Sequence, residues 1–233
     1  MERYIRTQAL LGSDAMEKLR SSKVIVFGVG GVGGYVVEAL ARSGVGSIDV
    51  VDPDKVSLSN LNRQIIALES TVGRQKTQVI KERVHDIDPS ISVHCYDIFY
   101  LPENSSQIDL SGYDYIVDAI DTVAAKVDII CRGKAEGIPV ITSMGFGNKL
   151  DPTMIEIADI SKTSVCPLAR AMRRLLRDRG VSHVTAVYSK EQPTTLSCEV
   201  DSAGKPSVSS IAFVPSVAGL VIASKVIRDL ASE

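Results

Sequence analysis

The sequence lacks several features that would assign a functional class at once. Its four cysteines form no Cys-x-x-Cys pair, so a metal site built on paired cysteines is disfavoured. The formal net charge is −2, which gives no overall basic surface for nucleic acid but leaves room for a local basic patch. The first residues, MERYIRTQALLG, lack the basic and then apolar pattern of a secretory signal. We therefore expect a cytoplasmic protein with reduced thiols.

A long hydrophobic run without interruption is also missing. Residues 206–224 carry no charged side chain, yet they include two prolines and a glycine. A membrane-spanning helix needs about 20 predominantly apolar residues. We therefore favour a buried turn followed by a core helix over residues 214–230, and we predict no membrane span.

Strands and helices alternate along the chain, and 45% of its residues are hydrophobic, enough for a sizeable core. Apolar runs predict strands over residues 23–27, 47–52, 91–96, 115–121, 139–144 and near 185–188. Helical patterns cover residues 33–44, 76–87, 124–136, 167–179 and 214–230. This order predicts an α/β fold with a Rossmann-like, mostly parallel sheet and helices on both faces. We expect a single domain over residues 1–233, with a nucleotide-binding core (1–144) and a C-terminal elaboration (145–233).

A glycine-rich loop, GVGGVG, follows the first predicted strand and opens the next helix. Gly28 permits the tight turn, Gly30 lets the backbone approach a phosphate, and Gly33 lets the helix pack closely on the sheet. Asp52 ends the next strand about 20 residues later, where its carboxylate can accept hydrogen bonds from ribose hydroxyls. The pattern predicts a nucleotide site, and by itself it suits NAD as well as ATP.

The polar residues after Asp52 favour ATP. They are Asn60, Asn62, Arg63, Gln64, Lys76 and Asp121. Arg63 and Lys76 could neutralise a triphosphate, and Asp121 could hold Mg²⁺ together with phosphate oxygens. Capping of turns and helices is the alternative for the two asparagines and the glutamine, and a solvated surface charge is the alternative for the two cations.

The chain resembles the ThiF/MoeB/HesA superfamily, the ATP-dependent adenylating enzymes related to ubiquitin activation. The resemblance rests on GxGGxG, D-x-D-x-V-x-x-S-N-L-N-R-Q, G-x-x-K and D-x-x-D, and runs from RYIRTQ to about residue 144. It implies that Asp52 binds ribose, that Asn62 and Arg63 contact phosphates, that Lys76 stabilises the departing pyrophosphate and that Asp121 carries Mg²⁺. The full set expected to bind nucleotide also contains Gly28, Gly30, Gly31, Gly33, Asp54, Asn60, Gln64, Asp118 and Thr122.

The same resemblance implies a homodimer in which Arg6 reaches the ATP of the partner; a plain capping segment is the alternative. Members that act on sulfur-carrier proteins commonly hold a zinc on two Cys-x-x-Cys pairs and place a cysteine in a loop. This chain has no such pairs, and Cys166 is better read as a small residue before the helix-starting Pro167. A monovalent-cation site and docking of sulfur-relay proteins are left open.

The C-terminal half resembles the tRNA-modifying members of the superfamily, through residues 143–153, 156–180 and 187–193. The implied reaction adenylates the carboxylate of a threonylcarbamoyl group on an adenosine of tRNA, after which an internal nitrogen attacks and AMP leaves. No thiol acceptor is needed. The alternatives are adenylation of a ubiquitin-like sulfur carrier, an NAD-dependent oxidoreductase, and a non-catalytic RNA-binding module.

A basic helix in this half is the predicted RNA-binding surface. Its cations and their neighbours are Lys162, Arg170, Arg173, Arg174, Arg177 and Lys190. Spacings of three and four place most of the arginines on one broad face that could follow an RNA backbone. A solvated helix face is the competing interpretation. Phe146 and Tyr188 are the aromatic residues placed to stack on bases.

Overall fold

One seven-stranded sheet organises the chain, for which a computed structural model describes residues 2–194 and 208–232. The strand order is β3-β2-β1-β4-β5-β7-β6, and every pairing is parallel except that of β6 with β7. The strands are β1 (Lys23–Phe27), β2 (Ser47–Val51), β3 (Cys95–Tyr96), β4 (Tyr115–Asp118), β5 (Val140–Ser143), β6 (Ile155–Asp159) and β7 (Thr185–Ser189). The predicted mostly parallel α/β fold is confirmed. The antiparallel edge strand β6 was not predicted, and β3 is shorter than expected.

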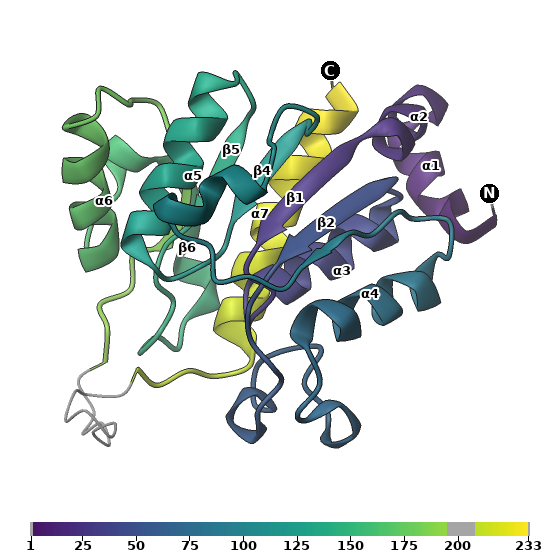
Figure 1. Ribbon diagram of the computed structural model, residues 1–233, viewed down its shortest axis with the longest axis horizontal. Coiled ribbons are helices and arrows are strands. Elements are labelled where there is room, and N and C mark those ends of the chain that lie inside the picture. The colour runs from purple at the N-terminus through teal and green to yellow at the C-terminus, as the bar shows by residue number, and fades with distance from the viewer. Residues whose placement is uncertain (1, 195–207, 233) are drawn as a thin grey trace.

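Helices cover both faces of the sheet (Figure 1). They are α1 (Ile5–Leu11), α2 (Ser13–Ser21), α3 (Gly33–Ser43), α4 (Lys76–Ile87), α5 (Val123–Ala135), α6 (Pro167–Arg177) and α7 (Phe213–Ser232). Five of them lie where the sequence predicted helices. The sequence did not predict α1 and α2, which are short and are separated at Gly12. No helix within the described residues is long and apolar enough to cross a membrane.

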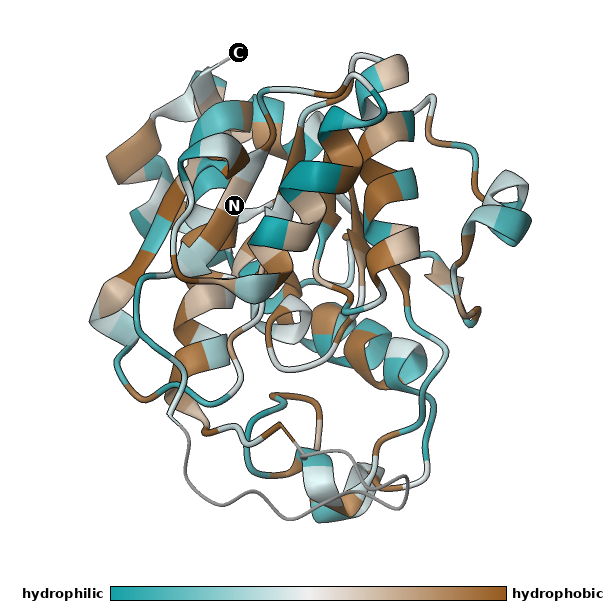
Figure 2. Cartoon of the chain, turned by 90° about the vertical axis from the view of Figure 1, so that its left-hand side faces the viewer, coloured by the Kyte–Doolittle hydropathy of each residue, from teal (hydrophilic) through white to brown (hydrophobic). Residues whose placement is uncertain are grey.

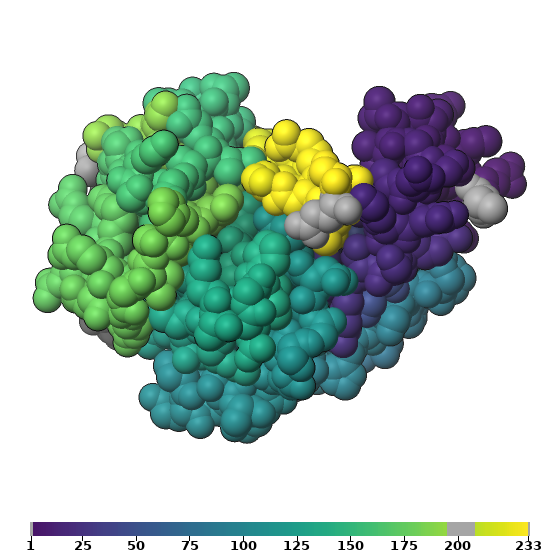
Figure 3. All heavy atoms as spheres, turned by 90° about the horizontal axis from the view of Figure 1, so that it is seen from above, coloured from purple at the N-terminus to yellow at the C-terminus, as the bar shows by residue number. Residues whose placement is uncertain are grey.

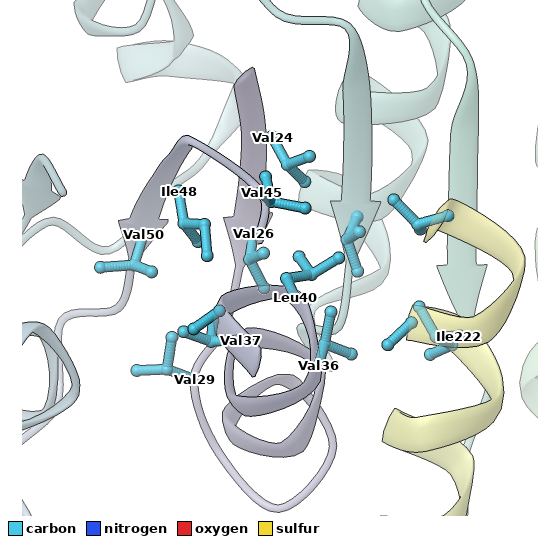
Figure 4. Packing of buried hydrophobic residues seen from close by; sticks show 14 of the residues in the cluster. Val24, Val26, Val29, Val36, Val37, Leu40, Val45, Ile48, Val50 and Ile222 are labelled. Atoms are coloured by element: carbon cyan, nitrogen blue, oxygen red, sulfur yellow. The ribbon is translucent and has the colours of Figure 1, made fainter. Parts of the chain in front are cut away.

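Two apolar cores lie on opposite faces of the sheet, because successive strand residues point in opposite directions. Val24 and Val26 of β1 belong to the core beneath α3, α4 and α7, and Figure 4 shows Val26 beside Leu40 of α3. Ile25 and Phe27 of the same strand belong to the core beneath α5 and α6. Each fully buried valine, leucine or isoleucine contributes roughly 1.5–3 kcal/mol. Figure 2 shows the resulting concentration of apolar residues along the central strands.

The strand order reverses direction between β1 and β4, which lie side by side at the centre of the sheet. From β1 the chain proceeds to β2 and β3 on one side, and from β4 it proceeds to β5 and β7 on the other. Open parallel sheets bind ligands at such a switch point, beyond the carboxyl ends of the strands. The glycine loop follows β1 at this place, and residues 52–75 form two small loops beyond the same edge (Figure 1).

Candidate nucleotide-binding site

The glycine loop is shaped by backbone contacts that exclude side chains. Gly28 adopts a φ of 84°, and a β-carbon there would lie 2.8 Å from the carbonyl oxygen of Ala119. A β-carbon on Gly33 would lie 1.8 Å from the carbonyl oxygen of Gly28, so only glycine allows α3 to begin here. At Gly30, by contrast, the nearest atoms lie 3.7 Å or more from the position of a β-carbon. The loop therefore leaves open space over its middle, where a phosphate needs to approach.

An unsatisfied polar atom borders that space. Gln64 is buried, and its Oε1 has no hydrogen-bond partner among the described residues. The amide group of Gln64 is also the group nearest to Gly30. Because a buried acceptor without a partner is costly, it is expected to be satisfied by a bound molecule or water. The residues present thus fit a nucleotide with hydrogen-bond donors at this position.

Asp52 joins the glycine loop to the loop that follows β2. Its Oδ2 accepts the backbone N–H of Val29 at 2.8 Å, and its Oδ1 accepts that of Asp54 at 2.9 Å. Burial raises the pKa of Asp52, while the nearby Lys76 ammonium and these two N–H groups oppose the rise. The Lys76 ammonium and the loop N–H groups therefore stabilise the ionised form of the Asp52 carboxylate.

Lys76 begins α4 and brings a buried cation to the same place. Its Nζ lies 2.8 Å from Oδ2 of Asp54 and 3.8 Å from Oδ1 of Asp52. Only 4% of Lys76 is exposed, whereas the side chain of Asp54 is 63% exposed. The structure therefore places a desolvated ammonium between the exposed carboxylate of Asp54, its nearer partner, and the buried carboxylate of Asp52. Such a cation interacts strongly with a phosphate that approaches it.

The segment after η2 (Leu58–Asn60) lies against the glycine loop. A β-carbon on Gly31 would lie 3.5 Å from Cγ of Arg63 and 3.3 Å from Cβ of Pro215 at the start of α7. The Arg63 guanidinium bonds the carbonyl of Ser59 and Oδ1 of Asn62, both at 2.8 Å, and remains exposed enough to meet an anion. The structure thus places Arg63 at the loop, as the sequence predicted.

Two neighbouring asparagines serve the local structure. Oδ1 of Asn60 accepts the backbone N–H of Ser57 at 3.1 Å, in a capping box that closes the short helix η2. Nδ2 of Asn62 donates to the carbonyl of Ser210 at 3.0 Å. Capping was the alternative interpretation for Asn60, and its buried side chain favours that interpretation over a direct nucleotide contact.

The two aspartates of the D-x-x-D motif, at the end of β4, have different surroundings. Asp118 is fully buried; its Oδ2 lies 2.9 Å from Nζ of Lys126 and accepts the hydroxyl of Thr142 at 2.5 Å. This ion pair occupies the carboxylate that was expected to contact nucleotide, so the prediction for Asp118 is corrected to an indirect role. Asp121, three residues later, is exposed.

Asp121 is available to a ligand. Its one described hydrogen bond is a long one, 3.5 Å from Oγ1 of Thr122, and no ion pair involves it within residues 2–194 and 208–232. The turn that carries it packs on the glycine loop, because Gly28 directly faces Ala119 and Ile120. An exposed carboxylate beside the glycine loop suits Mg²⁺, which takes one or two carboxylates and completes its shell with phosphate oxygens and water.

Arg6 lies far from this site within the same chain. It is exposed on α1, which packs with α2 at the amino end of the sheet, whereas the glycine loop lies at the carboxyl end (Figure 1). Seen from above, the N-terminal residues also lie on the opposite side of the molecule from residues 160–190 (Figure 3). A role for Arg6 at a nucleotide therefore requires a second copy of the chain.

The predicted RNA-binding residues fall into two groups. Arg170, Arg174 and Arg177 are exposed on α6, and Lys162 is exposed on η6 (Ile160–Lys162). Arg173 instead turns inward, because its Nη1 bonds the carbonyl of Thr163 at 3.0 Å and also the hydroxyl of that residue. These bonds give Arg173 a structural role, and its RNA contact stays a prediction.

Lys190 and the two predicted stacking residues lie elsewhere. Nζ of Lys190 lies 2.5 Å from Oε1 of Glu156, near the end of the β6–β7 pair opposite to η6. Tyr188 is 2% exposed, and Phe146 is 6% exposed within the core beside α7. The prediction that these two rings stack on bases is wrong, because both are packed against other side chains. Cys166 is buried directly before α6, in agreement with the favoured interpretation of it as a small residue before Pro167. Cys198 lies outside the described residues.

Two residues that shape the site were not predicted from the sequence. Lys126 is fully buried, and a lysine in the first turn of a helix ordinarily reads as a surface charge. Pro215 reaches the glycine loop from the other end of the chain, a contact that depends on tertiary structure alone. The one sequence feature that could have indicated a buried Lys126 is its position shortly after the two aspartates of the D-x-x-D motif.

The chain is similar to several known proteins. The ThiF family matches residues 1–233. A tRNA threonylcarbamoyladenosine dehydratase of Bacillus subtilis is 42% identical, over 99% of this chain and 95% of that protein. The crystal structure of the E. coli tRNA N6-threonylcarbamoyladenosine dehydratase TcdA in complex with ATP is similar, with a TM-score of 0.91 and 34% identity over 99% of this chain and 94% of that chain. A sulfur carrier protein adenylyltransferase of Thermus thermophilus is 37% identical over 54% of this chain and 47% of that protein.

Proposed function

This chain belongs to the ThiF family, and on that premise we propose that it uses ATP to dehydrate threonylcarbamoyladenosine in tRNA through adenylation of the carboxylate. The observation that carries the proposal is the convergence of Asp52, Lys76 and Arg63 around an open glycine loop, in a chain that matches tRNA threonylcarbamoyladenosine dehydratases over nearly its full length. A dinucleotide site explains the loop and Asp52 but gives no role to a buried lysine beside them.

The reaction has two steps. A carboxylate oxygen of the threonylcarbamoyl group attacks the α-phosphorus of ATP, and pyrophosphate leaves. An internal nitrogen of the same group then attacks the acyl carbon of the adenylate, AMP leaves with the carboxylate oxygen, and the nitrogen loses its proton to solvent. In sum the modified base loses one water, and ATP becomes AMP and pyrophosphate.

The site residues divide this work. Asp52 and the loop amides hold the ribose and phosphates, so that the α-phosphate is presented to the carboxylate. Lys76 and Arg63 stabilise the negative charge that develops as pyrophosphate departs. Asp121 would hold Mg²⁺, and the ion when bound would neutralise charge on the phosphates. Pro215 and Arg63 pack beside Gly31 at the edge of the glycine loop.

A groove beside α6 offers a surface for the tRNA. It has a volume of about 680 Å³ and is lined by, among others, Ser161, Arg170, Arg174, Arg177 and His183. Its exposed arginines recur on one helical face, suited to successive phosphates. Asp159 also lines the groove and brings a negative charge to it, with Oδ2 at 3.5 Å from Nδ1 of His183.

The proposed enzyme works as a homodimer. Arg6 lies at the amino end of the sheet, so it can assist an ATP only across an interface between two copies. A guanidinium delivered in this way would add to the charge stabilisation supplied by Lys76.

Charge reversal on the groove should weaken tRNA binding. In Arg170→Glu/Arg174→Glu we expect at least a tenfold loss of affinity and a shallower dependence of log K on log salt, by about one to two slope units, because about two phosphate contacts are lost. Binding is measured by fluorescence anisotropy at several salt concentrations.

The matched control is Arg20→Glu/Arg228→Glu, which makes the same change in net charge at exposed positions away from α6. We expect this control to bind tRNA almost as the parent does. Equal salt slopes for the groove variant and the parent would show that the helix is merely solvated.

The acceptor itself is tested by AMP release. Purified protein with ATP and Mg²⁺ should form AMP when tRNA carrying threonylcarbamoyladenosine is added, and not with the same tRNA lacking the modification. The second candidate acceptor is the C-terminal carboxylate of a ubiquitin-like sulfur carrier, which the similarity to the Thermus adenylyltransferase supports. AMP release with such a carrier alone would favour that acceptor and contradict the tRNA proposal.

A further inference from the structure

A buried ion pair lies directly beneath the turn that carries Asp121. Lys126 and Asp118 are both fully buried, and Nζ of Lys126 lies 2.9 Å from Oδ2 of Asp118. The same ammonium donates to the carbonyl of Ile120 at 3.1 Å. Its partners therefore are a strand-end carboxylate on one side and the backbone of the turn on the other.

Such a pair is an expensive way to stabilise a fold. Desolvation of two charges costs about as much as their attraction returns, and apolar residues of similar volume often do as well. The stability of the fold alone therefore does not explain this pair, and the bond to Ile120 supplies a second effect. Lys126 sits in the first turn of α5 while Ile120 precedes that helix, so the ammonium ties the turn to the helix start.

Backbone bonds hold the two ends of the turn, from the N–H of Ala119 to the carbonyl of Phe27 at 2.8 Å and from the N–H of Lys126 to the carbonyl of Thr122 at 3.0 Å. Between these ends the described contacts are weak. The N–H of Ile120 approaches Oδ1 of Asp118 at only 3.4 Å, and Asp121 has one long hydrogen bond, to Thr122. On its other side the turn meets the glycine loop through the carbonyl oxygen of Ala119. A shift of the Ile120 carbonyl therefore moves Asp121 relative to the phosphate site.

We propose that Lys126 is a positioning residue of the nucleotide site, which fixes the Ile120 carbonyl and thereby aims the Asp121 carboxylate at the metal that accompanies ATP. The inference rests on the proposed ATP-dependent function and goes beyond it, because it assigns a specific task to a buried residue that touches no substrate. Residues that orient metal ligands typically change metal affinity by about 10–100-fold when altered.

The test compares nucleotide binding with and without metal. In Asp118→Asn/Lys126→Met both charges are removed together, so that neither is left buried alone. By calorimetry, we expect ATP affinity in EDTA to stay within about twofold of the parent, since the glycine loop and Asp52 are unchanged. The Mg²⁺ concentration that half-saturates tight ATP binding should rise about 10–100-fold.

A second variant on the Asp121→Ala background makes the test sharper. If Lys126 acts through Asp121, adding Asp118→Asn/Lys126→Met to Asp121→Ala should not raise the half-saturating Mg²⁺ concentration any further. The effects of the two changes are then not additive. A control, Thr142→Val, removes a hydrogen bond to Asp118 and leaves the bond to Ile120; its Mg²⁺ dependence should stay near that of the parent.

If the paired variant does not fold, Lys126→Arg replaces it, because a guanidinium keeps the charge but displaces the Ile120 carbonyl in a fully buried space. An unchanged Mg²⁺ half-saturation in the folded variant would overturn the inference, as would a shift fully additive with Asp121→Ala. Neither readout needs tRNA. Normal Mg²⁺-dependent ATP binding without action on tRNA would contradict the proposed function and leave this inference standing.

Discussion

Replacing Asp121 with alanine is expected to reduce ATP-dependent AMP release by about 100- to 1,000-fold or more, with the fold retained. The reason is that the carboxylate stabilises, through the metal it holds, charge that develops on the phosphates, and groups in this role are worth that much in turnover. The residue is exposed, so its removal leaves no buried group unpaired. Turnover is followed as AMP and pyrophosphate, and folding as the melting temperature.

Asp14→Ala is the matched control for this variant, because Asp14 is also an exposed aspartate but lies on α2 at the amino end of the sheet. It should release AMP at the parent rate. Retained turnover in Asp121→Ala would show that Asp121 is not the metal carboxylate, and retained biological function would favour a non-catalytic RNA-binding module.

Lys76→Met is expected to lower turnover by a similar factor, about 100- to 1,000-fold, with a larger effect on kcat than on KM for ATP. Lys76 is buried beside Asp52, and its ammonium is the cation best placed to meet the departing pyrophosphate. The variant should also lose about 1–3 kcal/mol of stability, because Asp52 is left buried without its cation. Steady-state kinetics and thermal unfolding separate the two effects.

The same variant should change the pH dependence of ATP binding. The Asp52 carboxylate accepts hydrogen bonds from both ribose hydroxyls only when it is ionised. The affinity for ATP is therefore present above the pKa of Asp52 and is lost as the pH falls through that pKa. Burial already raises that pKa and Lys76 opposes the rise. Without Lys76 the loss of affinity should therefore begin at a higher pH than in the parent.

Lys76→Arg keeps the positive charge and is the control for these two effects. It should retain part of the turnover and a pH profile close to that of the parent. If Lys76→Met bound ATP with an unchanged pH profile, Asp52 and Lys76 would not be coupled as the structure indicates. Tight NADH binding without ATP binding would point instead to the oxidoreductase alternative.

The central part of the fold could be predicted because local pattern and tertiary structure agree there. β1 and α4 have the predicted bounds, since a short apolar run before glycines and an amphipathic run before Asp88 each admit one reading. The edge strand β6 was missed because its pairing with β7 is set by distant residues, and its side chains are only half-buried. The sequence therefore predicts the order of the elements where their side chains are consistently buried, and fails at a half-buried edge.

The site shows the same division. The glycines and Asp52 form a local motif, and the structure places them together at the switch point. What the sequence could not tell was which polar side chains turn inward. Arg173 and Asp118 resemble surface or ligand-binding groups in the sequence, and both are taken up by internal partners. Side-chain direction depends on what packs against an element, which spacing alone does not reveal.

The most direct test of the account is the mass of the modified nucleoside. The protein is incubated with ATP, Mg²⁺ and tRNA carrying threonylcarbamoyladenosine, the tRNA is digested, and the nucleoside is measured by mass spectrometry. We expect a product lighter by one water, formed only when ATP is present and absent with Asp121→Ala. A nucleoside of unchanged mass, in a sample that binds both ATP and the tRNA, would contradict this expectation.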